Sequence, residues 1–493
     1  MITSPNMMVV PKEEKRPLVV DLDGTLLQSD SLLESICAVI RRRFFDLFRL
    51  PLWLLRGLPY FKQKVYERND SDVTRLPYNL DILEALRIEQ KRGRKLILAT
   101  GAHQDFAQKV ADHLGIFSET HGSNASTNLT GTAKANRMLE RFGTKGFDYA
   151  GNSRVDKAVW RQASAAWLVS DSEAFSREVK QIIPVEKEFR FGPPRIKVYA
   201  KALRVHQWAK NLLIFLPTML SHRYFDTFNW ILCLLAFASF SFIASSVYIL
   251  NDLLDIEADR QHPDNRKRPF AAGTLSIASG WGLAPLLLSF GLGIGLYISV
   301  EYFWVVLGYF AMTCLYSVKL KQVALADIIV LAVLYTWRVL AGGVATETII
   351  SEWFLTFALF FFLSLALLKR CSELILLEQN QEKKNKRRGY VVSDLPLLLS
   401  FGVASSYLSV LVLALYLNDS RVSVQLRYPA ALWTLCPILL YWLSRLWLMA
   451  YRGKMTTDPL VFALRDRTSY IIALTAGSLW LLARGPQFLA FAF

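Results

Sequence analysis

The chain has 493 residues, with 57 Lys and Arg against 41 Asp and Glu, and a formal net charge of +16. At roughly 150 residues per domain, this length suggests about three units and excludes a single small domain. With 53% hydrophobic and 20% charged residues, the composition is too apolar for an ordinary soluble enzyme. Charged residues are concentrated in the first 200 or so positions, and apolar stretches near bilayer length follow. Part of the chain is therefore predicted to lie in a lipid bilayer.

Cysteine and histidine usage argues against a disulfide framework and a zinc site. The five Cys form no CxxC pair, and the six His show no HExxH-like spacing. The N-terminus also lacks the basic-then-apolar run of a signal peptide, so the first domain is expected in the cytoplasm.

Polar residues follow three short apolar runs near the N-terminus. These runs are 18–22, with Asp21 and Asp23; 95–99, before Thr100; and 147–151, before Asn152 and Asp156. Strands that alternate with helical patterns predict a parallel α/β sheet, whose ligands bind at the carboxyl ends of the strands.

The pair Asp21 and Asp23 suits phosphoryl chemistry. One carboxylate attacks phosphorus, and a second, two residues on and on the same side, handles the leaving-group proton. The segment DxDGT resembles the haloacid dehalogenase (HAD) phosphatase superfamily, and the match extends over its four motifs. The resemblance implies a Rossmann-like HAD domain with Asp21 as nucleophile, Asp23 as general acid/base, Thr100 and Lys134 on the phosphate, and Asp21, Asp23, Asn152 and Asp156 around Mg²⁺.

The last motif departs from the HAD pattern, because Asn152 stands where an Asp is usual. Loss of this charge should weaken Mg²⁺ binding. A weakly active domain, a regulatory module and a simple helix-capping turn therefore stay open as alternatives. The predicted boundaries are 1–190 for this domain, with a helical cap at about 30–90, and 191–202 for a linker. Cations and large apolar groups mix over 41–56, which suits either a membrane-surface segment or the cap.

From 203 to 493 the chain is predicted to be an all-α membrane domain of about nine transmembrane helices. The expected spans are 207–222, 228–250, 277–299, 302–318, 324–345, 353–371, 397–417, 429–450 and 467–485. Lys and Arg gather in alternate loops, so the positive-inside rule places these loops and the N-terminus in the cytoplasm, at the plasma (inner) membrane. This topology explains the positive charge without nucleic acid.

An acidic stretch follows the second span. On a continuous helix, Asn251, Asp255 and Asp259 are i, i+4 neighbours, and Asp252 lies one turn before Asp255, so four oxygen-bearing side chains share one face. Such close like charges favour Mg²⁺ between them, with positions left for a pyrophosphate. The cations that follow, Arg266, Lys267 and Arg268, are placed to meet further phosphate oxygens.

The pattern NDxxDxxxD followed by RPxxAG resembles the UbiA superfamily of intramembrane transferases, which cleave a Mg²⁺-bound pyrophosphate ester. The branch is suggested by residues 204–211 and 316–321, together with Asp327, Tyr335 and Arg338. They look like those of decaprenyl-phosphate 5-phosphoribosyltransferase, which joins phosphoribosyl pyrophosphate (PRPP) to a polyprenyl phosphate. This resemblance implies Asn251, Asp252, Asp255 and Asp259 as metal ligands, Asp252 and Asp255 as catalytic, and substrate contacts from Gln207, Lys210, Asn211, Arg266, Lys267, Arg268, Tyr316, Lys321, Asp327, Tyr335 and Arg338.

Arg338 supports this interpretation independently, because a guanidinium inside a span is costly and usually faces a polar cavity. Its alternative role is to pair with an acid on a neighbouring helix. The expected function is bifunctional: transfer of 5-phosphoribose to a polyprenyl phosphate, then removal of the 5-phosphate, with Mg²⁺ in both domains. The alternative is an aromatic prenyltransferase that uses an isoprenyl diphosphate and carries a regulatory or weakly active HAD domain.

Overall fold

The computed structural model describes residues 15–69, 72–124, 127–190, 195–221, 226–379, 389–419, 426–455, 459–463 and 466–484. The chain divides into two compact units. The sheet unit comprises Met1–Arg204 and Tyr248–Pro285, and the helical unit comprises Val205–Val247 and Leu286–Phe493. Each is described by itself.

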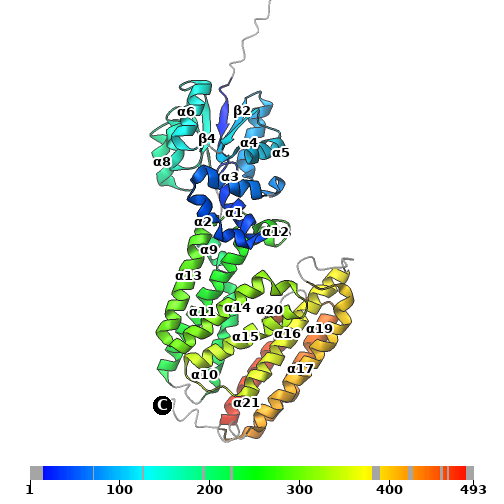
Figure 1. Ribbon diagram of the computed structural model, residues 1–493. Helices are drawn as coiled ribbons and strands as arrows, with labels where there is room; N and C mark the ends of the chain where they lie inside the picture. The colour runs from blue at the N-terminus through cyan, green and yellow to red at the C-terminus, as the bar shows by residue number, and fades with distance from the viewer. Residues whose placement is uncertain are drawn as a thin grey trace, which may run out of the picture. The chain divides into compact units, whose positions relative to one another are not determined.

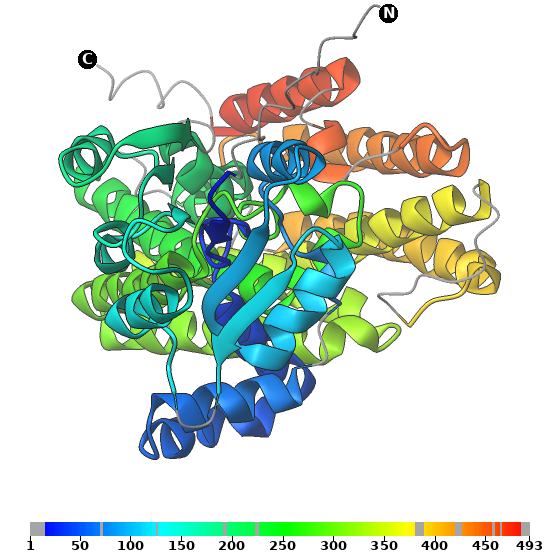
Figure 2. The ribbon, with the colours of Figure 1, turned by 90° about the horizontal axis from the view of Figure 1, so that it is seen from above.

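The sheet unit is built on six parallel strands in the order β3-β2-β1-β4-β5-β6. The strands are β1 (Leu18–Val20), β2 (Leu96–His103), β3 (Glu119–Ser123), β4 (Asp148–Gly151), β5 (Ala166–Val169) and β6 (Val185–Phe189). Val19 of β1 is in register with Ile97 of β2 and Tyr149 of β4, and β2 lies beside β3 (Figure 2). The predicted parallel sheet is confirmed, and β1 stands at its centre.

Alternation along the strands gives the sheet two buried faces. Leu18 and Val20 belong to one core with α4 (Leu80–Lys91) and α5 (Gln104–Leu114), whereas Val19 belongs to a second core. The helices of the second core are α6 (Gly131–Phe142), α7 (Lys157–Trp160) and α8 (Glu173–Lys180). Helices therefore cover both sides of the sheet (Figure 1).

The region predicted as a cap forms helices between β1 and β2. These are α1 (Ser31–Arg42), α2 (Leu50–Leu54) and α3 (Leu58–Arg68). Trp53 is buried with Phe61 and Val65, whereas Leu52 and Leu55 are exposed. One side of the segment 41–56 thus packs as a cap would. Its other side exposes apolar side chains, so the membrane-surface alternative stays open.

Two further short helices complete the sheet unit. Of the predicted linker, residues 191–194, with Pro193 and Pro194, lie outside the described residues, and 195–202 forms α9 (Arg195–Ala202). Helix α12 (Ile256–Arg260) lies in the second stretch of the unit.

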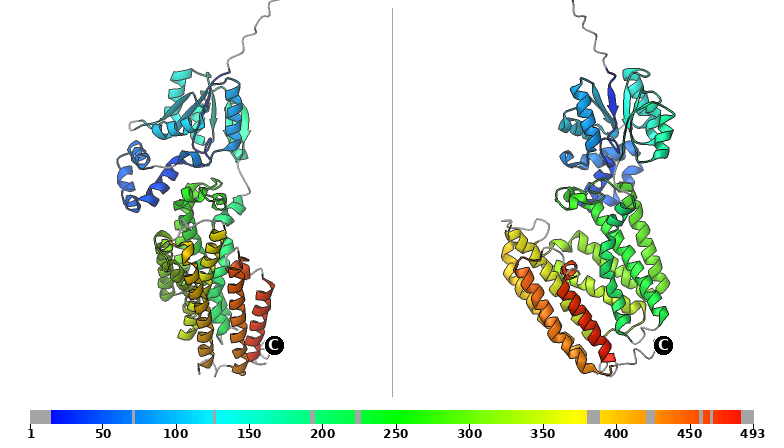
Figure 3. Two further views of the ribbon diagram at one scale, coloured as in Figure 1. Left: turned by 90° about the vertical axis from the view of Figure 1, so that its right-hand side faces the viewer. Right: turned by 180° about the vertical axis from the view of Figure 1, so that it is seen from behind.

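Seven of the described helices are long and apolar enough to cross a membrane. They are α11 (Thr227–Leu254), α13 (Ile277–Ile298), α14 (Val300–Val318), α15 (Ala326–Ala345), α16 (Glu352–Gln379), α17 (Leu395–Asn418) and α19 (Leu435–Tyr451). Helix α16 packs along both α15 and α17 (Figure 3). The chain is a multi-span membrane protein.

The predicted count of nine spans is not reached in the described part of the chain. The first expected span, 207–222, forms a 3₁₀ helix over Val205–Phe215 and the short α10 (Leu216–Leu220), where Pro217 lacks the N–H that a continuous helix would use. The last expected span corresponds to α21 (Arg467–Arg484), preceded by the short α20 (Pro459–Ala463), and neither is among the seven.

Candidate functional site

The carboxyl ends of β1, β2 and β4 bring the predicted HAD residues to one edge of the sheet. Asp21 follows β1, Thr100 lies in β2 and Asn152 follows β4. Because β1 has β2 on one side and β4 on the other, helices leave the sheet in opposite directions here, and such a point opens a crevice for ligands.

Asp21 is joined to a buried lysine and a buried tyrosine. Lys134, on α6, donates to Asp21 Oδ1 at 2.7 Å and to the Tyr149 hydroxyl at 3.0 Å. The Tyr149 hydroxyl in turn donates to Asp156 Oδ1 at 2.8 Å. Burial raises the pKa of Asp21 to about 6, although the Lys134 ammonium opposes this rise. Sequence reasoning missed Tyr149, whose only signal was a phenol three residues before Asn152.

Asp23 lies at the start of the cap. Its Oδ1 accepts a hydrogen bond from the Ser31 backbone N–H at 2.8 Å. Burial, with the negative charge of Asp30, raises the pKa of Asp23 to about 7. A carboxyl group that titrates near neutrality can both donate and accept a proton, which is what a general acid/base requires.

A second buried lysine, also missed from the sequence, lies near the end of β2. Lys62 of α3 donates to the Gly101 carbonyl at 2.6 Å and to Asn128 Oδ1 at 2.8 Å, and burial lowers its pKa. Thr100 is fully buried, and its hydroxyl accepts the Ala102 N–H at 3.0 Å. Helix α3 of the predicted cap thus brings a cation to the end of β2, which carries the predicted phosphate-binding Thr100.

Asp156 and Asn152 shape the loop after β4. Asp156 Oδ2 accepts the N–H groups of Asn152 at 3.1 Å and Ser153 at 2.9 Å. Asn152 packs on Gly24, where a Cβ would lie 2.0 Å from Asn152 Nδ2, and Gly24 also has a φ of +69°. A side chain at position 24 would therefore clash with Asn152.

The oxygen donors at this edge fit a hard cation. Asp21, Asp23 and Asn152 supply two carboxylates and an amide, the ligand types that Mg²⁺ accepts. Within the described residues, no group of three or more His, Cys, Asp or Glu side chains is arranged to hold a metal ion. Because Asn152 contributes an amide, this edge holds fewer carboxylates than the HAD pattern that the sequence resembles.

The acidic stretch differs from the expected continuous helix. Helix α11 ends at Leu254, and Asp255 has a φ of −97° and a ψ of 10° before α12 begins. Helical backbone hydrogen bonds still run across this break, from the Asp255 N–H to the Asn251 carbonyl at 2.9 Å and from the Asp259 N–H to the Asp255 carbonyl at 2.8 Å. The predicted continuous helix is thus interrupted at Asp255, and the shared face of the four side chains stays a prediction. Asp255 lies 3.1 Å from the Arg41 guanidinium of α1.

Asp252 and Asp259 nevertheless converge. Arg268 Nη1 lies 3.2 Å from Asp252 Oδ1 and 2.6 Å from Asp259 Oδ2. Arg204, which sequence reasoning did not select, also donates to Asp252. Both carboxylates are almost fully buried. One cationic nitrogen thus bridges two buried carboxylates, so the pair fits a divalent cation as a shared ligand set. Arg266 and Lys267 are exposed beside this pair.

The helical unit contains a buried polar cluster around Arg338 of α15. Its Nε donates to Asn211 Oδ1 at 2.9 Å, and its Nη2 donates to the Tyr309 hydroxyl at 2.7 Å. The Tyr335 ring lies 5.3 Å from the Arg338 guanidinium and 5.6 Å from Lys210 Nζ. Four predicted substrate contacts, Lys210, Asn211, Tyr335 and Arg338, therefore come together, and Tyr309 was missed.

A direct backbone contact holds Asn211 near α15. A Cβ at Gly342 would lie 2.0 Å from the Ile214 carbonyl oxygen, so only glycine allows this approach. Asn211 also donates to Ser241 Oγ at 3.0 Å. The predicted contacts Gln207, Tyr316 and Lys321 are half-buried.

Asp327 has a different environment from Arg338. It is fully buried, lies 2.8 Å from Arg370 Nη2 of α16 and accepts a hydrogen bond from the Tyr390 hydroxyl. Arg370 also pairs with Glu373. Asp327 is thus neutralised by a neighbouring helix, the environment of a structural ion pair.

Comparison with known proteins gives a family match over residues 212–465, to the model described as "UbiA prenyltransferase family". An uncharacterized protein of Sinorhizobium fredii, y4nM, is 36% identical over 96% of this chain and 92% of its own length. Decaprenyl-phosphate phosphoribosyltransferase of Mycolicibacterium smegmatis is 30% identical over 57% of this chain and 92% of its own. A UbiA homolog from Archaeoglobus fulgidus, solved bound to GPP and Mg²⁺, is 16% identical over 57% of this chain and 99% of its own, with a TM-score of 0.43.

Proposed function

Because the chain belongs to the UbiA prenyltransferase family, as its sequence predicted, we propose that it transfers 5-phosphoribose from PRPP to a polyprenyl phosphate and then removes the 5-phosphate. The convergence of Asp252 and Asp259 on one cationic nitrogen carries the first half of this proposal. The similarity to decaprenyl-phosphate phosphoribosyltransferase supports the choice of donor and acceptor.

In the first step, the acceptor phosphate oxygen forms a bond to C1 of the ribose while the bond from C1 to pyrophosphate breaks. Asp252 and Asp259 would hold Mg²⁺, which neutralises the leaving pyrophosphate when bound. Asn251 and Asp255 stay proposed ligands. Arg266, Lys267 and Arg268 offer guanidinium and ammonium groups to phosphate oxygens.

The cluster around Arg338 suits an anion. The three hydrogen bonds of its guanidinium go to neutral oxygens of Asn211, Tyr309 and Leu334. Its positive charge is therefore not cancelled by these partners and can attract a phosphate. We assign Lys210 and Tyr335 to the same task, together with Gln207, Tyr316 and Lys321. Asp327 contributes by fixing Arg370 and α16.

In the second step, Asp21 attacks the phosphorus of the 5-phosphate. The bond between phosphorus and the ribose oxygen breaks, and Asp23 gives that oxygen its proton. Water then attacks the phosphorus of the aspartyl phosphate, with Asp23 taking the water's proton, and inorganic phosphate leaves. Lys134 and Thr100 would orient the phosphate, and Asp21, Asp23, Asn152 and Asp156 would surround Mg²⁺. The raised pKa of Asp23, about 7, suits its role in both directions.

The test uses full-length protein in detergent with PRPP, Mg²⁺ and a polyprenyl phosphate, and mass spectrometry of the lipid. Wild type should yield polyprenyl-phosphoryl ribose, and Asp21→Asn should accumulate the 5-phosphorylated lipid, because the nucleophile is lost. No ribosyl lipid from wild type contradicts the first half. Full dephosphorylation by Asp21→Asn contradicts the second. Product from an isoprenyl diphosphate and an aromatic ring, with PRPP ignored, would identify the aromatic prenyltransferase instead.

We further propose that the membrane is the plasma (inner) membrane, with residues 1–190 and the acidic stretch in the cytoplasm. The basic loops support this orientation through the positive-inside rule. It would present the 5-phosphate of the lipid product on the side where the predicted phosphatase lies.

A further inference from the structure

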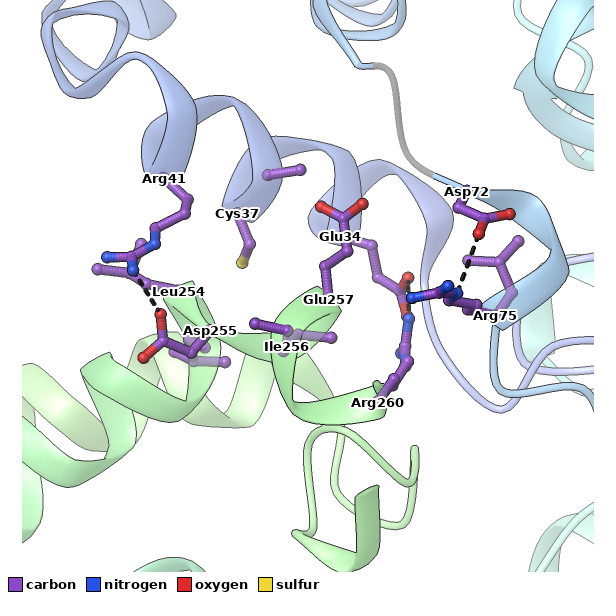
Figure 4. Close-up of a pocket in the computed structure, with 14 residues that line it drawn as sticks. Glu34, Cys37, Arg41, Asp72, Arg75, Leu254, Asp255, Ile256, Glu257 and Arg260 are labelled. Carbon is purple, nitrogen blue, oxygen red and sulfur yellow. Dashed lines mark hydrogen bonds and ion pairs between the residues drawn. The ribbon is translucent and has the colours of Figure 1, made fainter. Parts of the chain in front are cut away.

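Helices α1 and α12 of the sheet unit are joined by a buried ion pair. Arg260 donates to Glu34 through Nη1 at 2.9 Å and Nη2 at 2.6 Å (Figure 4). Both side chains are only 9% exposed, so water screens this pair little. Arg260 Nε also donates to the Ala271 carbonyl at 2.9 Å, which ties the loop after α12 to the same guanidinium.

Two more ion pairs connect the end of α1 with α12 and the residue that precedes it. Arg41 lies 3.1 Å from Asp255, and Arg42 lies 3.2 Å from Glu257. Cys37 and Ile256 line a small pocket, which lies between these ion pairs and Arg260 (Figure 4). The pair of Arg42 and Glu257 is solvent-exposed and is expected to contribute little.

Helix α1 therefore contacts residues next to both proposed sites. At its start, the Ser31 N–H holds Asp23, and one turn on Glu34 holds Arg260. Arg260 directly follows Asp259, which converges with Asp252 on Arg268. Since α12 has only five residues, the orientation of Asp259 depends on what fixes this short helix.

We infer that Glu34 is a positioning residue for the transferase metal site: by fixing Arg260, it sets the orientation of Asp259 relative to Asp252. This inference rests on the proposed function and adds a second role for the N-terminal domain. Helix α1 of this domain would help to position the acidic residues of the transferase site, in addition to the proposed removal of phosphate from the product.

The experiment measures ribosyl-lipid formation by full-length protein against Mg²⁺ concentration. Side chains that orient metal ligands typically change metal affinity by about 10- to 100-fold. Glu34→Gln should therefore raise the half-saturating Mg²⁺ concentration by about that factor, with kcat at saturating Mg²⁺ nearly unchanged. Arg42→Ala, which breaks the exposed pair on the same helices, is the matched control and should behave as wild type.

A second readout needs no turnover. Binding of Mn²⁺ is followed by electron paramagnetic resonance in the Asp21→Asn background, which weakens the other proposed metal site. Glu34→Gln should bind Mn²⁺ more weakly, and Glu34→Arg combined with Arg260→Glu should recover most of the loss. Unchanged Mn²⁺ affinity in Glu34→Gln overturns the inference. Weakened Mn²⁺ binding in a protein that makes no ribosyl lipid would support the inference and contradict the proposed function.

Discussion

Two buried arginines of the helical unit differ in their partners. Arg370 of α16 lies 2.8 Å from the Asp327 carboxylate and also pairs with Glu373. Arg338 of α15 bonds to the amide of Asn211, the phenol of Tyr309 and a backbone carbonyl. Burying a charge is costly in both places, but among the residues that the structure describes, carboxylates compensate the charge of Arg370 and not that of Arg338. The difference separates an arginine that is ion-paired between two helices from one that we propose binds a phosphate.

Removal of Arg370 should have the largest effect. Arg370→Leu leaves Asp327 buried without its cation, and breaking such a pair typically costs about 3–5 kcal/mol. We expect a strongly lowered melting temperature in detergent, measured by intrinsic fluorescence. The same substitution at Arg338 is the control. If Arg370→Leu melts like wild type, the pair does not stabilise the fold, and the comparison fails.

Arg338→Gln should affect activity more than stability. The amide can still bond to neutral neighbours, but the charge offered to phosphate is lost. Removal of one preorganised electrostatic group typically lowers kcat by about 10²- to 10³-fold. Ribosyl-lipid formation should fall by about this factor, with the melting temperature close to that of wild type. Wild-type kcat combined with a large loss of stability would make Arg338 structural, like Arg370.

Arg338→Lys should have the smallest effect of the three. It keeps the charge but cannot bond to Asn211, Leu334 and Tyr309 together, because an ammonium lacks the planar fork. About a 10-fold loss in kcat/KM is expected, intermediate between wild type and Arg338→Gln, from the same lipid assay. Equal losses for Lys and Gln would mean that geometry, and not charge, is what Arg338 supplies.

Much of this arrangement was predictable from the sequence. Short apolar runs that end in acids mark the ends of parallel strands, so Asp21, Thr100 and Asn152 could be placed at one edge of the sheet. The cost of a guanidinium in a span pointed to Arg338. These signals are local: each needs only a few neighbouring residues.

The remaining features depend on contacts between distant segments. Apolar residues flank Asp255 on both sides, so periodicity gave no sign of the helix break there. The pair of Glu34 and Arg260 joins positions 226 residues apart. Tyr149 contacts Lys134 of α6, and Lys62 of α3 contacts Gly101 of β2, so both contacts depend on long-range packing. The stretch 207–222 is apolar enough to suggest one α-helix, whereas its described part divides into a 3₁₀ helix and α10.

The contact of Gly342 with Ile214 has a consequence for inhibitor design. Two main chains touch there with no side chain between them, so the spacing between Asn211 and α15 cannot adapt by a change of rotamer. A compound that targets this cluster would therefore meet a rigid surface beside Gly342 and Ile214. Selective binding would depend on contacts with Tyr335 and Lys210, because their longer side chains can change rotamer when a compound binds.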